Sequence, residues 1–252
     1  MNEYTLTGSY TLPSLGKVYG DAKINPDITL RSMTTEEEMR RLNPSDRPYK
    51  VMADIIDACM VDKPGISAYD MCLGDYQFLM HKLRVVTYGS SYSLSSSCPY
   101  CGSTNSDKLD LEQMEVLTFS PDIEKYFELD LPRTKHHIRL KMQTPRMLDD
   151  VAVRAKEMRR KSPKMSGDPA FLLTVESMID TVDGEEMDVI DKPEFVRTLP
   201  MMDTNMIVSY AKKLNESVGL NMVLDNTCDV CGLDYQSTFR ATSEFYRPEI
   251  DT

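Results

Sequence analysis

The sequence lacks several features that would assign a function at once. It has no tryptophan, only three histidines and no apolar run near the length of a membrane span. It also lacks a Gly-rich phosphate loop, a nucleophile elbow and a spaced His–Glu–His set of metal ligands. The N-terminus has no basic start followed by an apolar stretch, so no export signal is expected. These absences disfavour membrane anchoring and the common motif-bearing enzymes, and we expect a protein that is cytosolic when made.

Basic charge is scarce as well. Lysine and arginine together number 29 against 40 acidic residues, which gives a net charge of −11. Proteins that bind nucleic acid usually carry a basic patch that displaces counterions from the phosphates, so this balance disfavours that class. The composition is otherwise that of a soluble globular protein, with 41% hydrophobic residues and enough length for one large domain or two small ones. The 18 methionines favour either an adaptable interaction surface or a methionine-rich core.

Hydrophobic periodicity predicts an α+β fold. After an extended N-terminal arm and a short helix near residue 34, longer helices are expected where apolar residues recur at helical spacing, at 49–60, 75–88, 145–158, 169–182 and 203–218. Strands are expected where apolar and polar residues alternate, at 90–97, within 109–142, and on both sides of residues 228–231. The predicted architecture is therefore helical regions and antiparallel strands arranged around a split cysteine-containing ribbon.

Four of the six cysteines form two Cys-x-x-Cys pairs, Cys98 with Cys101 and Cys228 with Cys231, and a glycine follows each pair. Without an export signal, such pairs indicate metal or redox chemistry rather than disulfides. The two intervening residues let both sulfurs face one point, and glycine adopts the backbone conformation that closes the turn. Two such turns predict a zinc ribbon with one structural zinc ion. Four thiolates would close its coordination shell, so catalysis at the metal is not expected.

Other interpretations of the cysteines are a thioredoxin-like redox site and a set of unpaired buried thiols. A redox site would need a single pair at the start of a helix, whereas here there are two pairs, both followed by glycine. Cys59 and Cys72 have no partner pattern, and Cys59 lies on an apolar helical stripe, where a core position is expected.

The two cysteine pairs are separated by residues 102–227, a longer gap than a compact ribbon needs. We therefore expect the middle of the chain to be inserted into the ribbon. Closing a long loop costs entropy that grows only logarithmically with its length, whereas structural zinc can contribute on the order of 10 kcal/mol. The predicted organisation is an arm (1–33), a helical region (34–97), a split ribbon (90–110 with 220–245), an inserted region (111–219) and a C-terminal tail (246–252).

Three further sets of residues are candidates for contacts with partners. A basic cluster stands out in the acidic chain and contains Arg154, Arg159 and Arg160 together with Lys156, Lys161 and Lys164. It is either a solvated helix end, where cations suit the helix dipole, or a docking patch for an acidic partner. Phe245 and Tyr246 are either exposed anchors or side chains packed on the chain's own ribbon. His81 lies off the apolar stripe of its helix and is expected at the surface.

Several segments, in order along most of the chain, resemble the baseplate hub assembly proteins of T-even-type contractile-tailed phages. They are residues 12–19 (LPSLGKVY), 28–38 (ITLRSMTTEEE), 75–89, 98–102 (CPYCG), 199–203 (LPMMD), 228–232 (CDVCG) and 245–248 (FYRP). The second cysteine pair departs from the family pattern, because Asp229 stands where proline is common. The resemblance implies a structural component or assembly factor of the central hub, with no catalytic residues. Its expected partners are other phage baseplate hub or tail proteins, and its expected location is the virion tail baseplate after assembly in the host cytoplasm.

Two other function classes compete with this interpretation. A nucleic-acid-binding zinc ribbon would carry basic and aromatic residues on its hairpins, but the sequence around the two cysteine pairs offers instead Asp107, Asp110, Asp225, Asp229 and Asp234. An enzyme with an unrecognised carboxylate site is the other alternative, and no carboxylate spacing in the sequence favours it.

Overall fold

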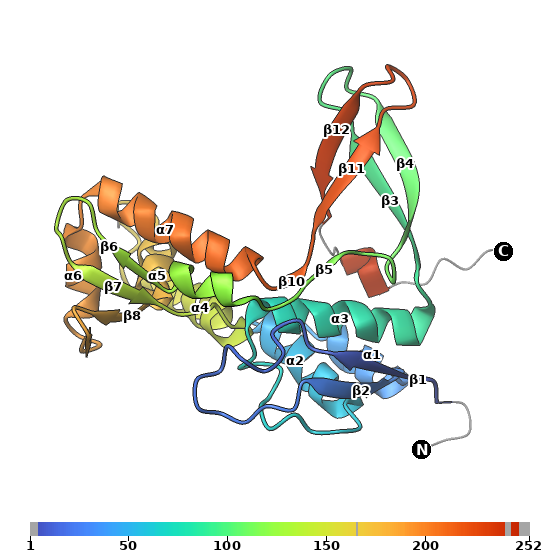
Figure 1. Ribbon diagram of the computed structural model, residues 1–252, viewed down its shortest axis with the longest axis horizontal. Helices are drawn as coiled ribbons and strands as arrows, with labels where there is room; N and C mark the ends of the chain where they lie inside the picture. Colours follow the sequence, from blue (N-terminus) through green and yellow to red (C-terminus); the bar gives the residue numbers. More distant parts are fainter. Residues whose placement is uncertain (1–4, 165, 240–242, 247–252) are drawn as a thin grey trace.

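The computed structural model describes residues 5–164, 166–239 and 243–246. Helices and small antiparallel sheets alternate along this part of the chain, which confirms the predicted α+β class. Figure 1 shows three regions: an N-terminal body around α3, a middle part that extends to one side, and two β-hairpins that project away from the body. In the described ranges, no helix combines the length and the apolar character needed to cross a membrane.

The N-terminal body packs three helices against one β-hairpin. Its elements are β1 (Thr7–Thr11), β2 (Asp27–Arg31), α1 (Thr35–Arg41), α2 (Pro48–Cys59) and α3 (Leu73–Tyr88). Thr34 and Glu37 form a capping box at the start of α1, and a proline occupies the first position of α2. Leu12, Ile28, Leu30, Ile56 and Leu79 belong to a shared hydrophobic core, so the N-terminal arm is part of this body.

The middle part has a hydrophobic core of its own. It contains a four-stranded antiparallel sheet in the order β6–β7–β8–β9 (Glu128–Asp130, His137–Leu140, Ile179–Val182 and Glu185–Glu186). The 3₁₀ helix η1 (Pro121–Tyr126) precedes the sheet. The same part contains four helices: α4 (Pro145–Lys161), α5 (Pro169–Met178), α6 (Lys192–Thr198) and α7 (Met201–Glu216). Helix α5 contacts β8, and the other three helices pack against α5.

One predicted helix is too long, because α5 ends at Met178 rather than at residue 182. The next four residues form β8, which turns through Asp183 and Gly184 into β9. Both turn residues have positive φ, 53° and 85°, as a tight hairpin turn requires. An Asp-Gly pair after a β-branched run is a hairpin signal, and it overrides the helical spacing of the apolar residues.

Buried Asp75 fixes the N-terminal arm to α3. Its carboxylate accepts hydrogen bonds from the Ser14 backbone N–H at 2.9 Å, from the Ser14 hydroxyl at 2.5 Å and from the Tyr19 hydroxyl at 2.5 Å. Burial raises the pKa of the Asp75 carboxyl, and these donors only partly offset the effect. The arm is therefore held by a buried polar network as well as by apolar packing.

A pair of glycines brings α3 against the strand that leaves the middle part. Strand β10 (Gly219–Leu220) pairs with β5 (Val116–Leu117), and Gly219 lies against Gly74 in the first turn of α3. A Cβ atom on Gly74 would overlap the carbonyl oxygen of Val218. Gly219 has a φ of +124°, which L residues rarely adopt. Only glycine at both positions allows this close approach of the two backbones.

Gly74→Ala is therefore expected to lower the free energy of unfolding by roughly 1–3 kcal/mol through overpacking. The sign is diagnostic, since the same change inside an exposed helix raises stability by about 1 kcal/mol. Urea unfolding followed by circular dichroism measures the difference. Gly20→Ala is the control, because open space surrounds Gly20 and only the backbone strain of its φ of +60° should be felt. A Gly74→Ala protein as stable as the wild type would contradict the close approach.

Candidate metal centre

The two cysteine pairs lie in the turns of two β-hairpins. One hairpin joins β3 (Ser91–Ser97) to β4 (Thr104–Asp110), and the other joins β11 (Val223–Thr227) to β12 (Asp234–Thr238). Figure 1 shows the hairpins side by side, with their turns at the end farthest from the body. The residues on either side of the middle part thus form one projecting arm, here called the ribbon arm (91–110 and 223–238).

The two turns have matching geometry. Gly102 donates its backbone N–H to the carbonyl of Cys98 at 3.0 Å, and Gly232 donates to that of Cys228 at 2.8 Å. The two glycines have φ values of 73° and 70°, within the left-handed region. The expected role of the glycine after each pair is therefore confirmed. Each turn directs its two sulfurs toward the other hairpin.

The four sulfurs of Cys98, Cys101, Cys228 and Cys231 lie within 4.8 Å of one another. The Sγ atoms of Cys98 and Cys231 are 3.8 Å apart, and those of Cys101 and Cys228 are 3.6 Å apart. Disulfide sulfurs would be about 2.05 Å apart. A tetrahedron with zinc–sulfur bonds of about 2.3 Å has edges of about 3.8 Å. The spacing of the donor atoms fits a tetrahedral thiolate site.

The four clustered sulfurs are here called the cage. A serine hydroxyl and the closeness of the sulfurs to one another shift the pKa values of the cysteine thiols in it. The Ser103 hydroxyl lies 3.1 Å from the sulfurs of both Cys101 and Cys228. This hydrogen bonding lowers the pKa of both thiols, that of Cys228 to about 5. Cys231 accepts from the Leu233 backbone N–H, which lowers its pKa, but burial and the neighbouring sulfurs outweigh this and raise it to about 12. Four sulfurs this close cannot all carry negative charge unless a cation lies between them.

Below the cysteines, a polar network joins the two hairpins. Asn105 in β4 is 3% exposed; its amide donates to the Tyr235 hydroxyl in β12 at 2.9 Å, and its carbonyl oxygen accepts from the Asp229 backbone N–H at 3.1 Å. The hydroxyls of Ser96 and Tyr235 are 2.6 Å apart. Asn105 is not recognisable from the sequence, because an isolated asparagine in a polar strand carries no periodic signal.

The basic cluster lies in the C-terminal half of α4, with Lys164 just beyond the end of the helix, and three of its members make ion pairs within the chain. Arg154 pairs with Glu176 at 3.1 Å, Arg159 with Asp168 at 2.7 Å and Lys156 with Asp46 at 2.6 Å. These pairs are mostly exposed and contribute little to stability. They fix the orientation of the cluster, and its role in docking stays a prediction.

Phe245 and Tyr246 are not exposed anchors. Phe245 is fully buried, and its ring centroid lies 4.8 Å from that of His81 and 5.4 Å from that of Tyr92. The Tyr246 hydroxyl donates to the Met80 carbonyl at 2.8 Å. Both residues lie in the 3₁₀ helix η2 (Ser243–Tyr246), which packs on α3 and the base of the ribbon arm. The exposed-anchor interpretation is wrong, and residues 247–252 of the predicted tail lie outside the described part of the chain.

His81 is also buried, contrary to the surface position predicted for it, with 1% of its surface exposed. Its Nδ1 is 2.8 Å from the Gln77 carbonyl, so this nitrogen carries the proton and donates. Burial lowers the pKa of His81 to about 4, and the ring is therefore neutral at pH 7. The prediction failed because α3 lies at the centre of the body and buries residues around most of its circumference.

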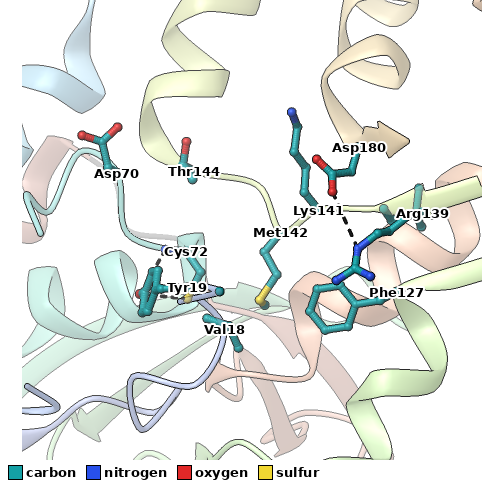
Figure 2. Close-up of a pocket in the computed structure, with 12 residues that line it drawn as sticks. Val18, Tyr19, Asp70, Cys72, Phe127, Arg139, Lys141, Met142, Thr144 and Asp180 are labelled. Carbon is teal, nitrogen blue, oxygen red and sulfur yellow. Dashed lines mark hydrogen bonds and ion pairs between the residues drawn. The ribbon is translucent and has the colours of Figure 1, made fainter. Parts of the chain in front are cut away.

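The remaining cysteines lie apart from the cage. Cys59 is fully buried in the N-terminal core, as its apolar stripe predicted, and burial raises the pKa of its thiol to about 11. Cys72 lies at a crevice of about 230 Å³ between the arm and the middle part, with its sulfur 3.5 Å from the Tyr19 hydroxyl. Figure 2 shows Arg139 and Asp180 on the opposite side of the crevice. Their Nε and Oδ2 atoms are 3.7 Å apart. Burial raises the pKa of Cys72, so its thiol is protonated at neutral pH and is a poor nucleophile.

The fold and the site define an α+β protein in which a four-cysteine, zinc-ribbon-like cluster joins distant parts of the chain. A family model described as "T4 bacteriophage base plate protein" matches residues 1–247, and the chain belongs to this family. It is therefore a phage baseplate protein, as its resemblance to baseplate proteins predicted. Comparison with curated proteins and with solved structures found no match.

Asn105→Ala is expected to loosen the contact between the hairpins. The substitution leaves the Asp229 N–H without its acceptor and the Tyr235 hydroxyl without its donor, at a cost of roughly 1–3 kcal/mol. Hydrogen exchange at the amides of β4 and β12 should accelerate. Asn226→Ala is the matched control, because the Asn226 side chain bonds only within its own hairpin in the described structure. Equal exchange in the two variants would contradict the role assigned to Asn105.

Proposed function

We propose that this protein is a component or assembly factor of the central hub of a phage tail baseplate and acts by protein–protein scaffolding. The observation that carries the proposal is the family match over nearly the whole chain. The ordered resemblance of several segments to hub assembly proteins supports the hub in particular. The proposed partners are other baseplate hub or tail proteins, and the proposed location is the virion tail baseplate after assembly in the host cytoplasm.

We further propose that one structural zinc ion is bound by Cys98, Cys101, Cys228 and Cys231. The support is the tetrahedral spacing of four soft sulfur donors that come from matched turns. When bound, the metal would supply a cross-link between the hairpins and the positive charge that lets the sulfurs ionise together. Four protein ligands leave no position for water or substrate, so the role we propose is structural.

The ribbon arm, in this proposal, is the part of the molecule that acts as a scaffold. The cage and the network around Asn105 hold two hairpins as one rigid projection, while the body and the middle part each have their own core. The middle part is then an insertion between the halves of the ribbon. The basic residues of α4, represented by Arg154, Arg159 and Arg160, supply a docking patch for an acidic surface.

Purified protein from zinc-supplemented cells is expected to contain one zinc per chain, and Cys228→Ser is expected to lose most of it. Metal removal should make the ribbon arm sensitive to protease while the helical circular-dichroism signal remains, because the helices pack in cores separate from the four proposed ligands. Elemental analysis and limited proteolysis measure both effects. Cys59→Ala is the control, since Cys59 lies in the N-terminal core and its loss should leave the metal in place. Wild-type protein without zinc, or a fully loaded Cys228→Ser variant, would refute the site.

Deleting the gene from a phage that encodes it is expected to leave infected cells without complete tails, and a plasmid copy should restore them. Mass spectrometry of purified particles and of lysates distinguishes a component that stays in the virion from a factor that leaves after assembly. Electron microscopy of baseplate intermediates carrying a tagged copy tests the hub location. Density at the periphery of the baseplate, or normal tails in the deletion strain, would contradict the proposal.

A further inference from the structure

The far end of the ribbon arm exposes apolar side chains that the described structure leaves uncovered. Tyr100 and Val230 occupy the same position in the two cysteine turns and are 63% and 73% exposed, and Leu233 is 50% exposed. Figure 1 shows both turns at the tip of the arm, away from the body and the middle part. Apolar residues gathered at the end of a rigid projection are typical of a contact surface.

The ribbon arm also carries an excess of negative charge, and two of its acidic residues lie at the tip. The ribbon arm contains one basic residue, Lys108, and five acidic ones: Asp107, Asp110, Asp225, Asp229 and Asp234. Asp229 lies within the second cysteine turn, and Asp234 follows it at the start of β12; both are exposed. With zinc bound as proposed above, four thiolates and one divalent cation add two further negative charges. A surface that fits the tip must be basic and must also offer apolar area.

The end of α4 has both properties. Arg160, Lys161 and Lys164 are exposed and make no ion pair within the described residues. The bond between Arg159 and Asp168 holds this helix end beside the start of α5. Phe171 in the first turns of α5 is 50% exposed. Basic side chains and an exposed aromatic ring thus lie at the junction of α4 and α5. This surface, made of Arg160, Lys161, Lys164 and Phe171, is here called the α4–α5 patch.

We propose that the ribbon tip of one copy docks on the α4–α5 patch of a second copy. The tip and the patch belong to separate parts of the molecule, so their pairing joins two chains rather than closing within one (Figure 1). The contact is heterologous, because each copy uses a different surface, and repeated contacts build a ring or a filament. The inference rests on the scaffolding role proposed above and deepens it by naming the acidic partner of the basic cluster.

The net charge of −11 repels copies at long range and works against association. Salt limits this repulsion, because the Debye length is about 8 Å at physiological ionic strength. Because of this screening, the charges that lie at the contact affect association more than the net charge of the whole chain does. They orient the two surfaces during association, while contacts between the apolar residues of the tip and Phe171 slow dissociation. Self-association should therefore weaken as salt rises but persist in part.

The test is sedimentation velocity of the full-length, metal-loaded protein over a concentration series at low and at high salt. Asp229→Lys with Asp234→Lys at the tip, and Arg160→Glu with Lys161→Glu on the patch, should each weaken self-association by at least about tenfold. A mixture of the two variants should associate again, because a basic tip then meets an acidic patch. Tyr100→Ser with Val230→Ser should also weaken the contact, without any change in charge.

Asp21→Lys with Asp62→Lys is the control for total charge, because both residues are exposed and belong to the body rather than to the ribbon arm. It shifts the net charge as much as the tip variant does and should not weaken association. Zinc content and circular dichroism of every variant identify any that fails to fold. A wild type that stays monomeric throughout, or variants whose mixture does not recover association, would overturn the docking. A self-associating protein that is absent from baseplates would instead contradict the hub role alone.

Discussion

Four sulfur atoms that converge from opposite sides of the middle part are the constraint on which the ribbon arm depends. Each hairpin alone is a short, polar two-stranded ribbon, and such ribbons are at best marginally stable in water. Among the described residues, the buried cluster at the cysteine end of the hairpins consists of Cys98, Cys228 and Tyr235, which is a small apolar area. The cysteine cluster and the polar network around Asn105 join the hairpins at this end.

The body and the middle part are organised differently. Each has a continuous apolar core, and the two regions meet at the glycine contact at the start of α3 and where α4 packs against α2. The network around Asp75 ties the N-terminal arm to the same helix. Helix α3 thus receives the arm on one side and the exit of the middle part on another, while η2 covers its C-terminal half. The helix at the centre of the body sets the positions of the other regions.

Much of the candidate site could be predicted from sequence, because its chemistry is local. Two residues between cysteines and a glycine after them determine a turn, and the structure has that turn twice. Long helices with one apolar stripe could also be predicted from the sequence. Most of the predictions that failed depended on distant partners. His81 was misplaced because the surroundings of α3 come from remote segments, and no local pattern identifies Asn105 as the link between hairpins. The helix expected through residue 182 failed for a local reason, since the prediction followed the apolar spacing and not the turn signal of Asp183–Gly184.

The short ladder between β5 and β10 has a consequence for how this chain can vary. It brings the departure and the return of the middle part together, with Asn221 donating its backbone N–H to the Glu115 carbonyl at 2.9 Å beside the paired strands. A segment that leaves and returns at one point can grow, shrink or diverge without displacing the hairpins that flank it. Natural selection can therefore rework the helices of this excursion while the cysteine-bearing projection keeps its shape.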